Sequence, residues 1–114
     1  MNVSLLRRYA GDVVIVDVTG RLCAGEAADG VREEIRALAA GGHKKILLNL
    51  AGTSFMDSSG IGQLVSGHTT LINQGGQMKL SNLTPRGKML LEITRLFIAL
   101  EVHEDEASAL AAFG

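Results

Sequence analysis

The residues of this chain that could do chemistry are concentrated in one short stretch, Asp57-Ser58-Ser59-Gly60-Ile61-Gly62. The stretch follows Ile46-Leu47-Leu48-Asn49-Leu50, an apolar run typical of a strand covered on both faces, and it precedes a helical pattern. Ligands and partners meet an open parallel sheet beyond the carboxyl ends of its strands. An Asp or Ser at a helix start can accept a hydrogen bond from an amide of the first turn. We therefore expect Ser58 to present an exposed hydroxyl at the positive end of a helix.

A serine at this place could act as a nucleophile or accept a phosphoryl group. A nucleophilic serine needs a base and a third group that orients the base. Of the three histidines, His68 lies on the apolar stripe of the following helix, and His43 and His103 lie near predicted strand edges. The Gly-x-Ser-x-Gly turn of the α/β-hydrolases is missing. Phosphoryl acceptance requires less, because a kinase supplies the base, the metal and the nucleotide. The sequence favours a phosphoacceptor over a serine hydrolase, and we expect no enzymatic activity.

Hydrophobic periodicity predicts an α/β fold with the element order ββαβαβαβα. The first expected elements are a hairpin of 3–6 and 13–18, a helix over 27–38 that ends at Gly41-Gly42, a strand over 46–50 and a loop over 51–56. A helix over 61–72, with Ile72 on its inner stripe, and a strand over 77–81 follow. The last expected elements are a helix from Thr84-Pro85 with Leu90, Ile93 and Phe97 on its inner stripe, a strand over 98–102 and a helix over 105–113. We expect a single domain over residues 1–114, with a mixed, mostly parallel sheet of four or five strands packed with about four helices.

The charge balance and the cysteine content exclude several classes of protein. Eleven basic and twelve acidic residues give a net charge of −1, which argues against a nucleic-acid-binding surface. A single cysteine, Cys23, cannot form an internal disulfide, so a reducing compartment is expected. Residues 1–8 carry charges where a secretory signal needs an apolar run, and no stretch is long enough for a membrane-spanning helix. Without a pair of histidines four residues apart, no metal site or cofactor is expected. We expect a cytoplasmic protein that binds neither nucleic acid nor membrane.

On these residues, the chain resembles the STAS domain family and, more narrowly, the bacterial anti-sigma factor antagonists. The resemblance rests on Phe55-Met56-Asp57-Ser58-Ser59-Gly60-Ile61-Gly62 and the apolar strand before it. Gly20-x-Leu22, the Gly75-Gly76 turn and the Asp105-Glu106-Ala107 helix start also stand where the family has them. The resemblance covers nearly the whole chain and implies a single STAS domain.

The resemblance implies a regulator that exchanges partners. In the family the first serine after the aspartate is the phosphoacceptor, which corresponds to Ser58. The unmodified antagonist binds an anti-sigma factor, itself an ATP-dependent serine kinase, and so releases the sigma factor. Phosphorylation ends this binding, and a metal-dependent serine phosphatase restores it. A phosphate dianion beside Asp57 would repel a surface fitted around a neutral hydroxyl. The alternative keeps the fold as a scaffold or small-ligand-binding module of a stress-signalling assembly, without a working phosphoswitch.

The surface expected to meet the partner surrounds Ser58 and comprises Arg21, Cys23, Met56, Asp57, Ser59, Gly60 and Gly62. Simpler interpretations compete for several of these residues. Met56 would be a core residue, the two glycines would allow close packing of helix on sheet, and Arg21 would be a solvated loop charge. Cys23 stands where the family often has an acidic residue, a departure that bears on recognition by the kinase.

Overall fold

The amino-terminal hairpin and the three strands that follow it form one sheet, with strand order β1-β2-β3-β4-β5. The computed structural model describes residues 3–23, 26–95 and 100–113. The strands are β1 (Val3–Ala10), β2 (Val13–Leu22), β3 (Lys45–Met56), β4 (Gln77–Ser81) and β5 (Glu101–His103), and the helices are α1 (Glu26–Ala40), α2 (Ser58–Asn73), α3 (Pro85–Thr94) and α4 (Glu106–Ala112). β1 is antiparallel to β2, and the other three neighbouring pairs are parallel. The predicted element order and the mixed, mostly parallel α/β sheet are confirmed.

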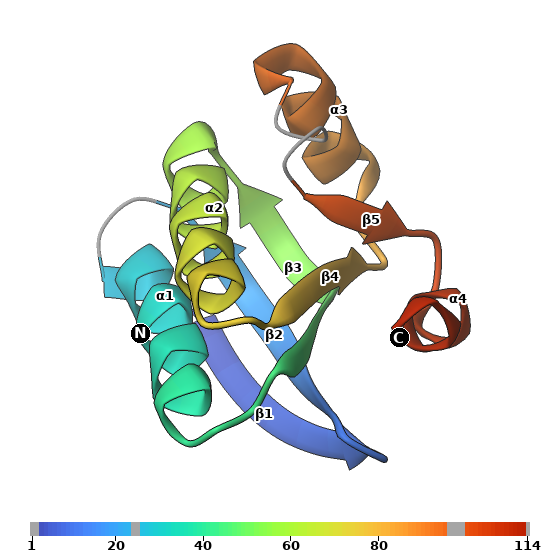
Figure 1. Ribbon diagram of the computed structural model, residues 1–114. Helices are drawn as coiled ribbons and strands as arrows, with labels where there is room; N and C mark the ends of the chain where they lie inside the picture. The colour runs from blue at the N-terminus through green and yellow to red at the C-terminus, as the bar shows by residue number, and fades with distance from the viewer. Residues whose placement is uncertain (1–2, 24–25, 96–99, 114) are drawn as a thin grey trace.

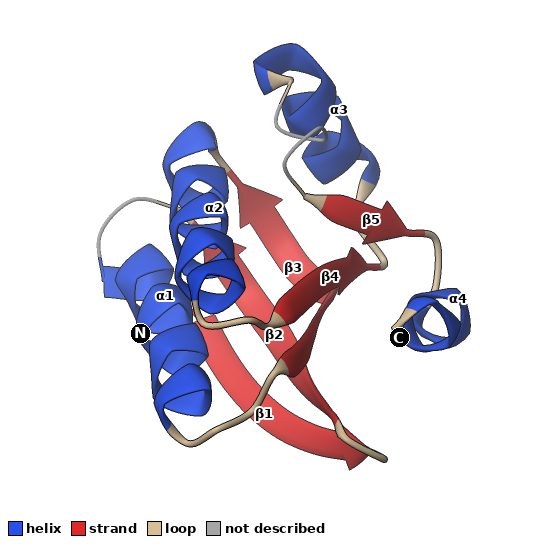
Figure 2. Cartoon of the chain, viewed as in Figure 1, coloured by secondary structure: helices blue, strands red, loops and turns tan. Residues whose placement is uncertain are grey.

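Helices lie on both faces of the sheet: α1 and α2 cover one face, and α4 lies on the other (Figures 1 and 2). The larger core lies between the sheet and the first two helices and includes Val14, Val16, Val18, Ile46, Leu48 and Leu50 from the strands with Val31, Ile35, Leu38, Ile61, Leu64 and Leu71 from the helices. A smaller cluster on the opposite face joins Val13, Ile15 and Leu47 to Ala109 of α4. The first halves of β2 and β3 are thus buried on both faces, which explains their unbroken apolar sequences.

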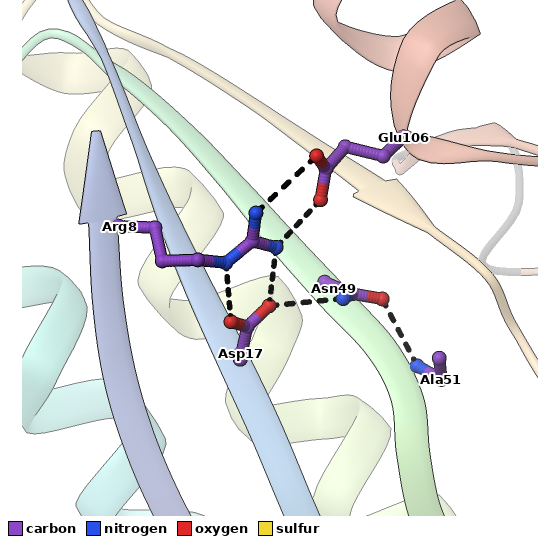
Figure 3. A network of polar contacts seen from close by, with 5 residues as sticks. All are labelled: Arg8, Asp17, Asn49, Ala51 and Glu106. Atoms are coloured by element: carbon purple, nitrogen blue, oxygen red, sulfur yellow. Dashed lines mark hydrogen bonds and ion pairs between the residues drawn. The ribbon is translucent and has the colours of Figure 1, made fainter. Parts of the chain in front are cut away.

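A polar network fixes α4 against the sheet (Figure 3). The Arg8 guanidinium on β1 donates from Nε to Asp17 Oδ2 on β2 at 2.5 Å and from Nη2 to Glu106 Oε1 on α4 at 2.6 Å. The Asn49 amide on β3 donates to Asp17 Oδ1 at 2.9 Å. The hydrogen bond from Arg8 lowers the pKa of Asp17, and the hydrogen bond from Asn49 lowers it to a smaller extent. The Asp17 carboxylate joins three strands, and the Arg8 guanidinium joins the last helix to them.

The predicted loop over residues 51–56 is wrong, because β3 continues as a strand to Met56. β2 also runs further than expected, and the two strands pair from Thr19 with Gly52 to Leu22 with Met56. The register shifts twice along this segment, as at a β-bulge. Ala51 and Gly52, at the start of this segment, have low strand propensity, so pairing with β2 continues the strand past them.

Two predicted helix faces also need correction. Ile72, expected on the inner stripe of α2, is 47% exposed, and Ile93 of α3 is 70% exposed. α3 instead buries Gly87 and Leu91, while Phe97 lies outside the described residues. The last strand begins at Glu101, and residues 98 and 99 of its predicted range also fall outside them.

Candidate functional site

The junction between β3 and α2 places Ser58 at the surface. Asp57 has extended backbone angles (φ −122°, ψ 178°) and is the N-cap of α2. Its Oδ1 accepts a hydrogen bond from the Gly60 amide at 2.9 Å, as expected for a capping aspartate. Ser58 and Ser59 are the first two residues of the helix, and both are exposed. Ser58 is exposed at a helix N-terminus, as predicted.

Gly60 and Gly62 occupy different environments, although they are two residues apart. Gly60 is buried, and a Cβ placed on it would overlap the main-chain carbonyl of Leu22 at the end of β2. The interpretation of close helix–sheet packing is therefore correct for Gly60, and its expected place on the partner surface is wrong. Gly62 is exposed, and a Cβ there would meet no atom within 4 Å. Gly62 leaves the surface of the first helical turn open.

Met56 is a core residue and not an exposed contact. Its side chain is 1% exposed and belongs to the larger core cluster. The expected partner-contact role of the Met56 side chain is therefore wrong. Register explains the difference, because Met56 pairs with the fully buried Leu22 and its side chain follows Leu22 into the core.

Two arginines converge on one aromatic ring beside this junction. The guanidinium carbon of Arg21 lies 5.0 Å from the centroid of the Phe55 ring, and that of Arg86 lies 4.8 Å from the same centroid. Arg86 Nε also donates to the main-chain oxygen of Met56 at 3.3 Å. Both arginines are exposed. Arg21 belongs to the end of β2 and not to a loop, and it contacts Phe55 as well as solvent.

Phe55 was predicted only as part of the motif, with no role for its side chain, and Arg86 was not predicted at the site. Arg86 lies in the first turn of α3. Thr84 caps this helix, because its Oγ1 accepts a hydrogen bond from the Gly87 amide, and Pro85 is the first helical residue. α3 begins just after β4, and β4 runs parallel to β3. The residues that follow these two strands therefore lie at the same edge of the sheet. That topology was the available signal for Arg86.

Cys23 lies near the same junction. The residue before it, Leu22, accepts a hydrogen bond at its carbonyl from the Asp57 amide at 3.3 Å. Cys23 is half-buried, and its thiol forms no disulfide. Of the expected partner surface, five residues are at least partly exposed: Arg21, Cys23, Asp57, Ser59 and Gly62. Met56 and Gly60 are buried.

The part of the chain that the structure describes comprises residues 3–23, 26–95 and 100–113. No group of three or more His, Cys, Asp or Glu side chains there could hold a metal ion. No helix in those ranges is long and apolar enough to cross a membrane.

Comparison with known proteins agrees with this geometry. The family model of the STAS domain matches residues 6–109. The chain belongs to the STAS domain family. A curated relative from Paenibacillus polymyxa, named anti-sigma F factor antagonist, is 33% identical over 112 residues, which cover 96% of this chain and 94% of the relative.

Solved structures share the STAS fold at lower sequence identity. An anti-sigma factor antagonist from Mycobacterium paratuberculosis matches with a TM-score of 0.83 at 20% identity, over 96% of this chain and 92% of that one. The Bacillus cell fate determinant SpoIIAA in its phosphorylated form matches with a TM-score of 0.71 at 21% identity, over 96% of this chain and all of that one.

Proposed function

We propose that this STAS domain is an anti-sigma factor antagonist that is switched off by phosphorylation of Ser58. The observation that carries the proposal is the exposed hydroxyl of Ser58, in the first turn of α2 and next to the capping Asp57. The relative that is 33% identical over nearly the whole chain bears the name of such an antagonist. The unmodified form binds an anti-sigma factor and thereby frees a sigma factor for transcription. This role would place the protein in the cytoplasm.

In the proposed switch, the anti-sigma factor is also the kinase. The Ser58 oxygen attacks the γ-phosphorus of ATP, the bond from that phosphorus to ADP breaks, and the hydroxyl proton passes to a base of the kinase. This chain supplies only the acceptor and the surface around it. A serine phosphatase reverses the modification by hydrolysis, which returns the hydroxyl and releases inorganic phosphate.

Charge explains why the modification would end binding. A phosphoserine adds roughly −1.5 to −2 charges at neutral pH. The charge would appear next to the Asp57 carboxylate, in a surface fitted around a neutral hydroxyl. Like-charge repulsion and the desolvation of the phosphate then oppose association, and about 1.4 kcal/mol of such opposition lowers affinity tenfold. A penalty of about 3 kcal/mol would weaken binding about 100-fold.

The helix geometry supports a regulator over a serine hydrolase. His68 is on the same helix as Ser58 but ten residues further along, which separates the two residues by roughly 15 Å at 1.5 Å per residue. A base must approach the serine hydroxyl to about 3 Å. His68 is also half-buried, and this burial lowers its pKa. We accordingly propose a non-enzymatic protein whose partners are the kinase and the phosphatase.

Phosphate mapping tests the proposal. The anti-sigma factor captured from the source cells by the wild-type protein is incubated with the protein and ATP, and the phosphate is located by mass spectrometry. We expect modification at Ser58, its loss in Ser58→Ala and its retention in the matched control Ser59→Ala. Phosphate on another residue, or a stable large assembly that takes up no phosphate, would contradict the proposal and favour the scaffold alternative.

A further inference from the structure

Arg21 and Arg86 differ from most arginines of the described chain in having no carboxylate partner. Ion pairs to Asp or Glu are formed by Arg7, Arg8, Arg32 and Arg36. Among the described side chains, those of residues 3–23, 29–95 and 100–113, Arg21 and Arg86 form no such pair, and both lie against the Phe55 ring. An exposed guanidinium on an aromatic face keeps its positive charge and its N–H donors available for an anion.

The two guanidinium groups lie in the same neighbourhood, because both contact the Phe55 ring. Each lies within 5.0 Å of the same ring centroid, so their central carbons are within about 10 Å of each other. Two positive charges within this distance repel, and an anion bound to both would offset that repulsion. Phosphate suits such a place, because guanidinium groups bind phosphate oxygens through paired, charge-assisted hydrogen bonds.

Ser58 lies near Arg86, one of the two arginines. Arg86 Nε contacts the main-chain oxygen of Met56, two residues before Ser58, which places Nε at most roughly 10 Å from the Ser58 Cα. A phosphoryl group extends from the serine side chain and shortens that gap. The bond from Arg86 to Met56 is long, at 3.3 Å against about 2.9 Å for a good N–H···O bond, so an anion could replace it readily.

We propose that Arg21 and Arg86 form an intramolecular clamp for the phosphoryl group on Ser58, an inference that rests on the proposed function. In the phosphorylated chain the guanidinium of Arg86 leaves the Met56 carbonyl and, with Arg21, binds the phosphate oxygens. The clamp favours the dianion over the monoanion. It also withdraws both cations from the surface that meets the anti-sigma factor.

The acidity of the phosphate measures the clamp directly. Phosphoserine is incorporated at position 58 during synthesis of the full chain, without any kinase, and the ³¹P chemical shift is followed against pH. The variants are Arg21→Gln, Arg86→Gln and the double variant. The matched control is Arg36→Gln, which removes an exposed arginine near the end of α1. The end of α1 leads to the start of β3, whereas Ser58 follows the end of β3.

The double variant should raise the pKa of the phosphate by roughly 0.5 or more, each single variant by part of that amount, and Arg36→Gln should leave it unchanged. Arg86→Lys, which keeps the charge, should stay closer to the wild type than Arg86→Gln. Equal values in all proteins, or an equal rise in Arg36→Gln, would overturn the clamp. Failure of the kinase to modify Ser58 would defeat the proposed function without affecting this titration. A flat titration alongside normal phosphorylation would defeat the clamp alone.

Discussion

The main-chain carbonyl of Leu22 occupies the place that a methyl group on Gly60 would need. The same carbonyl accepts the hydrogen bond from the Asp57 amide. The end of β2 is therefore packed directly against the first turn of α2, and this contact fixes the position of Ser58 relative to the sheet. Gly60 supports the site from below and is not itself a contact surface.

Substitution of Gly60 and of Gly62 should distinguish a packed glycine from an exposed one. Gly60→Ala should lower the free energy of unfolding by about 1–3 kcal/mol, because the new methyl group must displace the backbone of Leu22. Gly62→Ala, in open space on the same helical turn, should raise it by up to about 1 kcal/mol. Urea denaturation measures both. Equal effects of the two substitutions would show that the packing described here is wrong.

Much of the fold could be predicted from local signals. The hairpin turn at Gly11, the cap formed by Thr84 and Pro85, and the strand from Gln77 to Ser81 all follow from residue types at fixed spacing. The exposed position of Ser58 followed in the same way, because a capping aspartate after a buried strand specifies where a helix begins.

The rest depends on contacts between distant segments. The strand at residues 51–56 continues past Ala51 and Gly52, which have low strand propensity, because it pairs with β2. The same is true of Arg86, which reaches the site only because α3 starts at the edge where β3 ends. Likewise, the polar network that joins Arg8 to Glu106 spans nearly the full length of the chain (Figure 3).

The network around Asp17 predicts a specific dependence of stability on pH. Arg8 lowers the pKa of Asp17 below its ordinary 3.8, so this carboxylate stabilises the fold above that pH, and the stabilisation is lost as the pH falls through the lowered pKa. Asp17→Asn should lower the free energy of unfolding at pH 7 by about 1 kcal/mol, since the groups are partly exposed. The difference from wild type should shrink as the pH falls below 3.8.

Denaturant unfolding at a series of pH values measures this difference. Asp29→Asn is the matched control, because the Asp29 side chain is 55% exposed and 4.0 Å from its nearest cationic partner, Arg32. A difference between wild type and Asp17→Asn that is the same at pH 3 and pH 7 would exclude the stabilising role of the ionised carboxylate.

His68 should destabilise the protein in mild acid. Burial lowers its pKa below 6.5, so between the two pKa values the unfolded chain binds a proton that the folded chain does not. The free energy of unfolding should therefore fall as the pH drops below 6.5. His68→Gln should remove that part of the pH dependence, as measured by unfolding curves between pH 5 and 8. Parallel pH profiles for the two proteins would contradict a lowered pKa of His68 in the folded chain.

The affinity of the anti-sigma factor for the two forms of Ser58 tests the central claim most directly. Isothermal titration calorimetry with the captured anti-sigma factor would compare the unmodified chain, the chain with phosphoserine at position 58, and Ser58→Ala. We predict that Ser58→Ala binds like the unmodified chain and that phosphoserine weakens binding about 100-fold, or about 3 kcal/mol. Equal affinity of the phosphorylated and unmodified chains would contradict the phosphoswitch.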